Sequence, residues 1–135
     1  MEGNRQNTGR CPGPRPVLEG FLRALLMDRD PAKALLFLTV DVLSAGPDGR
    51  TARSREEFRA AAEAHLREVP GQLPYGILDY REKEETPECR TCLCRIRNPG
   101  VKGGPVVLLS AVFRKSRGSW RISGLHISGT EGPVR

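Results

Sequence analysis

The residues best suited to bind a ligand or take part in catalysis lie near the end of the 135-residue chain, in the stretch GSWRISGLHIS (118–128). This stretch contains Trp120, the only Trp, and His126, one of two His. If it forms a regular strand, alternation places Trp120, His126 and Ser128 on one face. An indole wall beside an imidazole that donates or accepts a hydrogen bond suits a small ligand with a polar head. The alternative is structural: Trp120 packs the sheet against a helix, and His126 is held by a hydrogen bond.

The second histidine, His65, lies on the apolar stripe of a predicted helix, one turn after Ala61 and Ala62. This position favours a core or interface histidine over a ligand. Two histidines do not by themselves make a transition-metal site. We therefore expect no metal site and no cofactor.

Three of the four cysteines lie close together, at Cys89, Cys92 and Cys94. In a strand, Cys92 and Cys94 point to one side and Cys89 to the other, so three thiolates do not converge on one ion. A redox pair favours a helix N-terminus, which lowers the thiol pKa, whereas the residues that follow are typical of a strand. We expect reduced thiols that pack as small hydrophobic side chains.

The elements that must position these residues fall into two halves. Apolar spacing and capping signals predict helices over about 17–28, from Pro31, and over 54–69, where Ser54 and Glu57 form a capping box. Alternation and turn clusters predict one short strand and then a meander of four, over 40–44, 73–82, 88–97, 105–115 and 119–128. Helices followed by an antiparallel meander predict the α+β class, with the helices on one face of the sheet.

Composition limits the classes of partner. The net charge is +6, but no block of five like charges occurs and Arg often stands beside Glu, which is typical of solvated faces and not of a nucleic-acid interface. No apolar run approaches the roughly 18 residues of a membrane span, and the first residues lack a secretory signal. We expect a cytoplasmic protein without nucleic-acid or membrane partners.

Composition along the sequence divides the chain into three parts. Residues 1–16 are polar and rich in Gly, Pro and Arg, which predicts a flexible leader. Residues 17–130 are long enough for one domain with a real core. Residues 131–135 form a tail.

In this order the elements resemble those of the NTF2-like superfamily, in the group of the SnoaL-like domains. The closing strand of that group commonly reads Trp, a basic or polar residue, Ile, and then His-x-Ser, matched here by Trp120, Arg121, Ile122, His126 and Ser128. The stretches RDPAKALLFLTVDV (29–42), ARSREEF (52–58) and ILDYREKE (77–84) match further. The chain looks closest to bacterial sensory versions that accompany signalling modules.

The resemblance implies a cone, in which a curved sheet wraps around the helices and leaves a pocket beside the first helix. It also implies a homodimer through the exposed face of the sheet. Enzymes of this fold use a carboxylate base near the end of the first strand, a position that falls here on Leu43 or Ser44. Asp41 and Asp79 remain, but they do not form an evident pair.

We therefore expect a non-catalytic module that binds a small molecule, or that serves as a dimerising sensory input. Trp120, His126, Tyr80 and Ser128 are the predicted ligand-binding residues, with Tyr80 as a wall and Ser128 at the rim. Two alternatives stay open. One is a small enzyme of the SnoaL or ketosteroid-isomerase kind that uses His126 or Asp41 as general base, and the other is an interaction module whose cone is filled by its own side chains.

Overall fold

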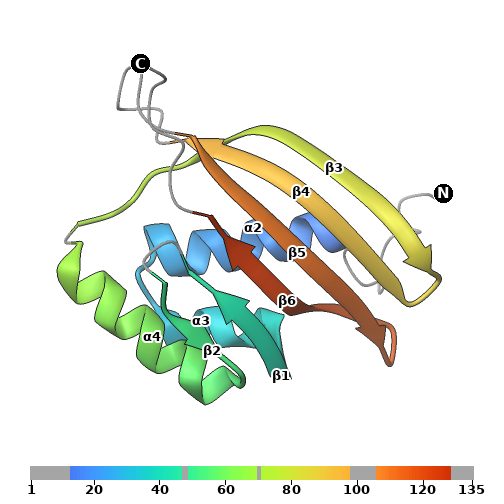
Figure 1. The fold of residues 1–135 in the computed structure, drawn as a ribbon, viewed down its shortest axis with the longest axis horizontal. Helices are drawn as coiled ribbons and strands as arrows, with labels where there is room; N and C mark the ends of the chain where they lie inside the picture. The colour runs from blue at the N-terminus through green and yellow to red at the C-terminus, as the bar shows by residue number, and fades with distance from the viewer. Residues whose placement is uncertain (1–12, 47–48, 70, 98–105, 129–135) are drawn as a thin grey trace, which may run out of the picture.

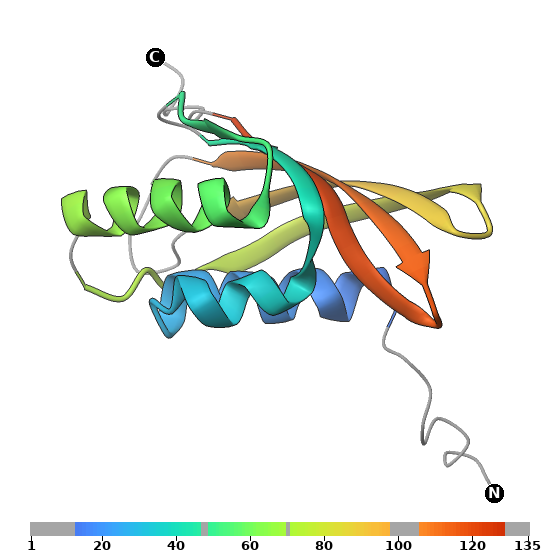
Figure 2. The ribbon, with the colours of Figure 1, turned by 90° about the horizontal axis from the view of Figure 1, so that it is seen from below.

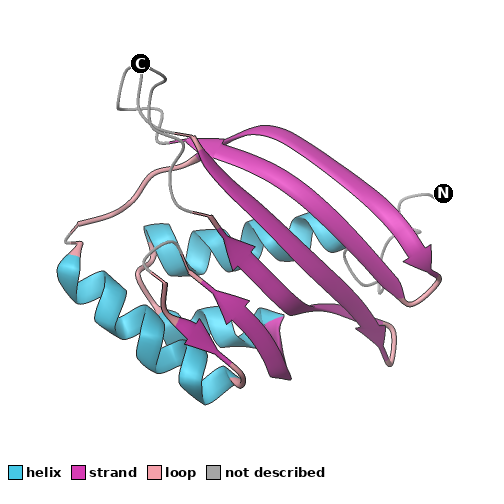
Figure 3. Cartoon of the chain, viewed as in Figure 1, coloured by secondary structure: helices cyan, strands magenta, loops and turns pink. Residues whose placement is uncertain are grey.

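A computed structural model of the chain describes residues 13–46, 49–69, 71–97 and 106–128. A six-stranded sheet in the order β2-β1-β6-β5-β4-β3 forms one layer, and helical segments form the other (Figures 1 and 3). The strands are β1 (Leu38–Ala45), β2 (Thr51–Ala52), β3 (Gly76–Thr86), β4 (Cys89–Arg97), β5 (Val107–Ser116) and β6 (Ser119–Ile127). The helical segments are α2 (Pro14–Leu22), η1 (Arg23–Met27), α3 (Pro31–Ala34), η2 (Leu35–Phe37) and α4 (Arg55–Glu68).

The meander from β3 to β6 is antiparallel throughout, and β1 joins it as a parallel neighbour of β6. Figure 2 shows the sheet bending around the helices, which all lie on one side of it. We call this side of the sheet the inner face and the opposite side the outer face. The predicted α+β class, with helices on one face of a mostly antiparallel sheet, is confirmed.

The helix starts follow the capping signals of the sequence. The Ser54 hydroxyl accepts from the amide of Glu57 at 3.1 Å, and the Glu57 carboxylate accepts from the amide of Arg53 at 2.8 Å. Asp30 likewise caps α3 by accepting from the amide of Lys33 at 3.1 Å. These side chains satisfy amides that have no partner inside the helix, so both starts are fixed locally.

Three features differ from the sequence-based prediction. Helix α2 begins at Pro14, inside the stretch predicted as leader, because a proline suits the first helical position; residues 1–12 lie outside the described residues. The two-residue strand β2 was not predicted. Val40 and Val42 do not share a face as strict alternation requires, because the pairing of β1 with β6 shifts register between Leu38 and Leu43.

One arginine ties the helical layer together. Arg29 adopts a positive φ of 52° between η1 and α3. Its guanidinium donates to the carbonyls of Leu66 at 2.7 Å and Val69 at 2.8 Å, and also to that of Gly71. Because carbonyls at the end of a helix lack partners within it, Arg29 caps the C-terminus of α4 from a distant segment.

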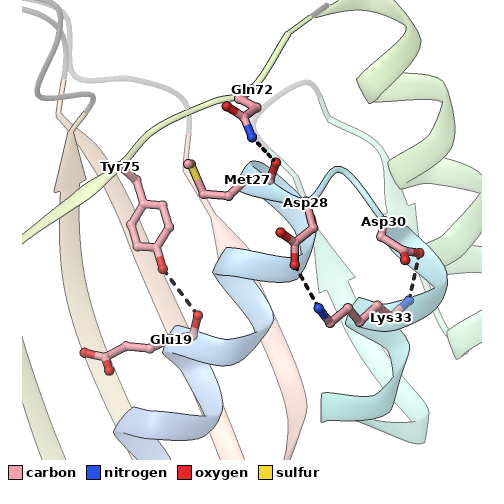
Figure 4. Close-up of polar contacts among 7 residues, drawn as sticks. All are labelled: Glu19, Met27, Asp28, Asp30, Lys33, Gln72 and Tyr75. Atoms are coloured by element: carbon pink, nitrogen blue, oxygen red, sulfur yellow. Dashed lines mark hydrogen bonds and ion pairs between the residues drawn. The ribbon is translucent and has the colours of Figure 1, made fainter.

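Polar contacts also fix the chain where it enters β3 (Figure 4). The Tyr75 hydroxyl donates to the carbonyl of Glu19 in α2 at 3.3 Å, and the Gln72 side-chain amide donates to the carbonyl of Met27 in η1 at 3.1 Å. These bonds hold the start of the meander against α2 and η1.

The core lies between the inner face and the helices. Its largest fully buried side chains are Phe21, Phe113, Leu18, Leu22, Leu38, Leu109 and Ile122. Cys92 and Cys94 are buried in the same core, and Cys89 pairs opposite Arg114 on the outer side of the sheet. The predicted split of the three thiols between two faces is confirmed. Among the described residues no group of His, Cys, Asp or Glu could hold a metal ion, and none of the described helices has the length and apolarity of a membrane span.

Candidate functional site

The two rings of the last strand do not share a face, contrary to the prediction from alternation. Phe113 of β5 pairs with Ile122, but the next residue of β5, Val112, pairs with Gly124. Ser123 is therefore an extra residue, a β-bulge, and its hydroxyl donates to the Val112 carbonyl at 3.4 Å. Beyond the bulge the alternation is reversed.

The bulge places the residues of the predicted site on opposite faces of the sheet. Trp120 precedes the bulge and lies on the inner face with 8% of its surface exposed, whereas His126 follows it and is exposed on the outer face. Ser128 follows β6, and its backbone amide donates to the Leu108 carbonyl at 2.8 Å. The expectation that an indole and an imidazole point together into the cone is wrong, because one extra residue inverts which side chains face inward.

Trp120 is enclosed by charged side chains near the hairpin that joins β5 to β6. The Arg90 guanidinium lies 5.3 Å from the indole centroid, and the Lys115 ammonium lies 5.8 Å from it. Cation–π contacts of this kind stabilise a buried indole. The surroundings of Trp120 agree with the structural alternative, in which it packs the sheet.

Tyr80 lies on the inner face of β3, half-buried, and its hydroxyl is already engaged. It donates to the Glu82 carboxylate at 2.7 Å, and Glu82 also forms a 2.8 Å ion pair with Arg90. Burial, and next the bond to Glu82, raise the pKa of Tyr80 above its ordinary value. The Arg15 guanidinium stands 5.1 Å from the centre of the ring. Tyr80 thus belongs to a polar network at the rim of the core.

The cone itself contains a small cavity of about 70 Å³ between α4, η1 and the ends of β1 and β6. Its lining is mainly apolar, with Leu25, Phe58, Leu66 and Ile127 among the residues, and His65 reaches it from α4. Ligand pockets usually measure several hundred Å³, so most of the cone is filled by side chains of the protein. The histidine that lines the cone is His65, whose place on an apolar helical stripe was the sequence signal for an inward position.

The outer face carries a much larger hollow, of about 620 Å³. Its centre is formed by Leu93 of β4 and Val112 of β5, with Gly124 and His126 of β6 beside them and Leu43 of β1 at the edge. Leu93 is 57% exposed and Val112 is 37% exposed. Gly124 has no side chain, so the sheet surface is lowest beside Val112, which lies 3.4 Å from where a Cβ would stand.

Charged side chains surround this apolar centre. Asp41 pairs with Arg114 at 3.0 Å on one side, and Asp79 pairs with Arg95 at 3.7 Å on the other. An apolar centre with a polar rim is the usual anatomy of a protein–protein interface. We call this surface, from Leu43 across β6, β5 and β4 to Asp79, the outer-face patch.

Asp41, the carboxylate considered as a general base, and Asp79 both lie on the same outer face. The side chain of Asp41 is 72% exposed and paired with Arg114. Asp79 lies two strands beyond β5, beside Arg95, so the two acids do not form a pair. Ser44 lines the cone cavity and Leu43 the outer hollow. The described lining of the cone cavity therefore contains no carboxylate.

Solved structures establish the fold. A protein of unknown function from Pseudomonas putida, described as NTF2-like, superposes with a TM-score of 0.70 at 14% identity, over 84% of this chain and 82% of that one. A candidate calcium/calmodulin-dependent protein kinase type II association domain from Thiobacillus denitrificans gives 0.72 at 16% identity, over 93% and 98%. A candidate ketosteroid isomerase from Parabacteroides distasonis gives 0.68 at 12% identity, over 87% and 85%.

Sequence comparison adds nothing to these matches. No family model matches the chain, and no curated protein matches it. At such low identities the superpositions carry the fold alone. The chain has the NTF2-like, or cystatin-like, fold.

Proposed function

We propose that the chain is a non-catalytic assembly module that forms a homodimer through the outer-face patch. The observation that carries this proposal is the exposure of Leu93 and Val112 at the centre of a wide hollow, while the cone beneath the sheet is nearly filled. An antiparallel sheet with one solvated face should show polar side chains there. Contiguous apolar surface with a polar rim instead favours a protein partner.

A second copy of the chain is the partner that fits best. A two-fold interface buries the same patch on both subunits, so the patch must complement itself. The apolar centre does so, and each rim carries both signs of charge, Asp41 beside Arg114 and Asp79 beside Arg95. The likeness to a candidate association domain agrees with a role of this fold in assembly.

A homodimer is also compatible with the sensory role expected from the sequence. As a dimerising input, the module would bring two signalling partners together, which is the bacterial sensory role that the resemblance implies. A small molecule inside the cone is less well supported, because the cavity is about 70 Å³. Catalysis by His126 or Asp41 is also less well supported, because both lie on the outer face and not in that cavity.

Sedimentation equilibrium of the wild type and two variants tests the proposal. Leu93→Glu places a charge at the centre of the patch. Leu36→Glu makes the same change at a leucine of η2 that is also exposed, at 68%, but lies outside the patch. We expect a dimer of the 14.9 kDa chain for the wild type and Leu36→Glu, and a monomer for Leu93→Glu with an unchanged circular dichroism spectrum. A monomeric wild type would refute the homodimer, and a Leu93→Glu variant that stays dimeric would refute the outer-face patch as its interface.

A further inference from the structure

A second hollow, also of about 620 Å³, lies at the end of the sheet where β1 begins. Its lining combines three elements with the first residues of β1: Arg55 at the start of α4, Arg114 and Lys115 near the end of β5, and Arg121 of β6. These four cations come from separate parts of the sequence. The fold brings them together in one basic groove, although the sequence contains no run of basic residues that would predict it.

Most of the charge in this groove is not neutralised. Asp41 pairs with Arg114, but among the described residues no ion pair is formed by Arg55, Lys115 or Arg121. Arg121 donates to the Leu36 carbonyl at 3.4 Å, and Lys115 faces Trp120, so neither contact supplies a compensating negative charge. Three cations without an acidic partner make the groove a favourable place for carboxylates.

The floor of the groove offers backbone groups as well as charge. Strand β2 pairs with β1 only at Ser44 and Ala45, and the pairing with β6 breaks between Leu38 and Leu43. In the described chain, the residues of β1 from Thr39 to Val42 therefore have no register partner in β2 or β6. A strand segment of this kind is a template for an added extended segment.

The surface beside this segment also has an apolar element. Val40 is 64% exposed, and it lines the groove together with Leu38. In an extended peptide, side chains alternate between two sides, so one side can contact Val40 while carboxylates on the other contact the arginines. Backbone, apolar and charged features of the groove thus match one type of ligand.

We propose that this basic groove binds an extended acidic peptide segment of a partner protein. The segment pairs with the open backbone of Thr39–Val42 and directs carboxylates to Arg55, Lys115 and Arg121. Nucleic acid is disfavoured because binding of single strands relies on exposed aromatic rings for stacking, and Trp120, the aromatic ring in contact with a groove cation, is 8% exposed. The groove shares Arg114 with the rim of the outer-face patch. The three other cations do not line that patch, so the peptide site does not require the homodimer.

Fluorescence anisotropy with a labelled peptide of about ten residues, alternating Glu and Val, tests this site. The controls are a peptide with Lys in place of Glu, one with alternate backbone amides methylated, and a single-stranded oligonucleotide of equal charge. We expect binding of the acidic peptide that weakens as salt rises. We expect a loss of about tenfold or more for the methylated peptide, which lacks the donors for strand pairing.

Two charge-reversal variants locate the binding. Arg55→Glu removes a groove cation at the N-terminus of α4, where an acidic residue suits the helix dipole and the fold is retained. Arg67→Glu changes the net charge equally at the other end of the same helix, outside the groove. We expect Arg55→Glu to weaken binding about tenfold, as for loss of a charge-assisted contact, and Arg67→Glu to change it about twofold or less.

Three results would overturn the proposal. The first is no binding of the acidic peptide, or equal binding of the lysine peptide. The second is an Arg55→Glu variant that binds like the wild type. The third is tighter binding of the oligonucleotide than of the peptide. Repeating the titration with Leu93→Glu separates this site from the homodimer, since we expect that variant to bind the peptide with unchanged affinity.

Discussion

The two faces of the sheet are built from the same strands, yet they meet different surroundings. On the inner face Phe113 and Ile122 are completely buried under the helices. On the outer face Val112, the chain neighbour of Phe113, is 37% exposed, and Leu93 is exposed further. The helices of the same chain bury the inner face. The outer face has apolar side chains without a cover in the described chain, and this difference is the physical reason to expect a partner there.

The largest expected effect comes from truncating neighbouring residues on the two faces. Phe113→Ala leaves a cavity in a packed core and should lower the free energy of unfolding by about 3–5 kcal/mol. Val112→Ala removes a partly exposed side chain and should cost about 1 kcal/mol or less in the monomeric Leu93→Glu background. Urea unfolding followed by circular dichroism measures both. Equal losses for the two variants would remove the distinction between the faces.

A smaller effect is expected from the arginine that holds α4 over the inner face. Arg29→Ala leaves the carbonyls of Leu66 and Val69 without their donor. We expect a loss of about 1–3 kcal/mol, the usual cost of removing a partner from partly buried polar groups. Arg67→Ala, an exposed arginine of the same helix, is the control and should change the free energy of unfolding by about 0.5 kcal/mol or less. An Arg29→Ala variant as stable as this control would show that the contact does not secure the helix.

The reactivity of the cysteine thiols reports the difference between the two faces of the sheet without any change to the fold. Burial raises the pKa of Cys92 to about 12 and that of Cys94 to about 11, whereas Cys89 lies on the opposite side of β4. At pH 8 a thiol of pKa 11 is thiolate in only about one molecule in a thousand. In a Cys11→Ser background, a thiol reagent at pH 8 should modify Cys89 quickly and the two others only as fast as the protein unfolds. Rapid modification of all three would contradict the assignment of Cys92 and Cys94 to the core.

Local signals in the sequence predicted most of the fold. The Ser54 cap, the proline after Asp30 and the turn clusters between strands each act through neighbouring residues, so their meaning does not depend on the rest of the chain. The four strands of the meander lie within a few residues of their predicted bounds. The same holds for the facing of Cys92 and Cys94, because β4 is regular between them.

The candidate site was less predictable, because it depends on long-range geometry. The bulge at Ser123 shows only in the pairing of β6 with β5, and without it His126 would face the cone. The basic groove depends on bringing Arg55 beside Arg114 and Arg121, which are far apart in sequence. No local sequence pattern predicts the bulge or the groove. Charges that are scattered along the chain can therefore still form one surface.

Hydroxyl-radical footprinting is the decisive measurement of whether a second copy covers the outer-face patch. It reports the exposure of individual side chains in solution, for the wild type and for Leu93→Glu under the same conditions. We expect Leu43 and Val112 to be protected in the wild type and to become reactive in Leu93→Glu, while Leu36 reacts equally in both. Equal reactivity of Leu43 and Val112 in the two proteins would show that no second copy covers the patch.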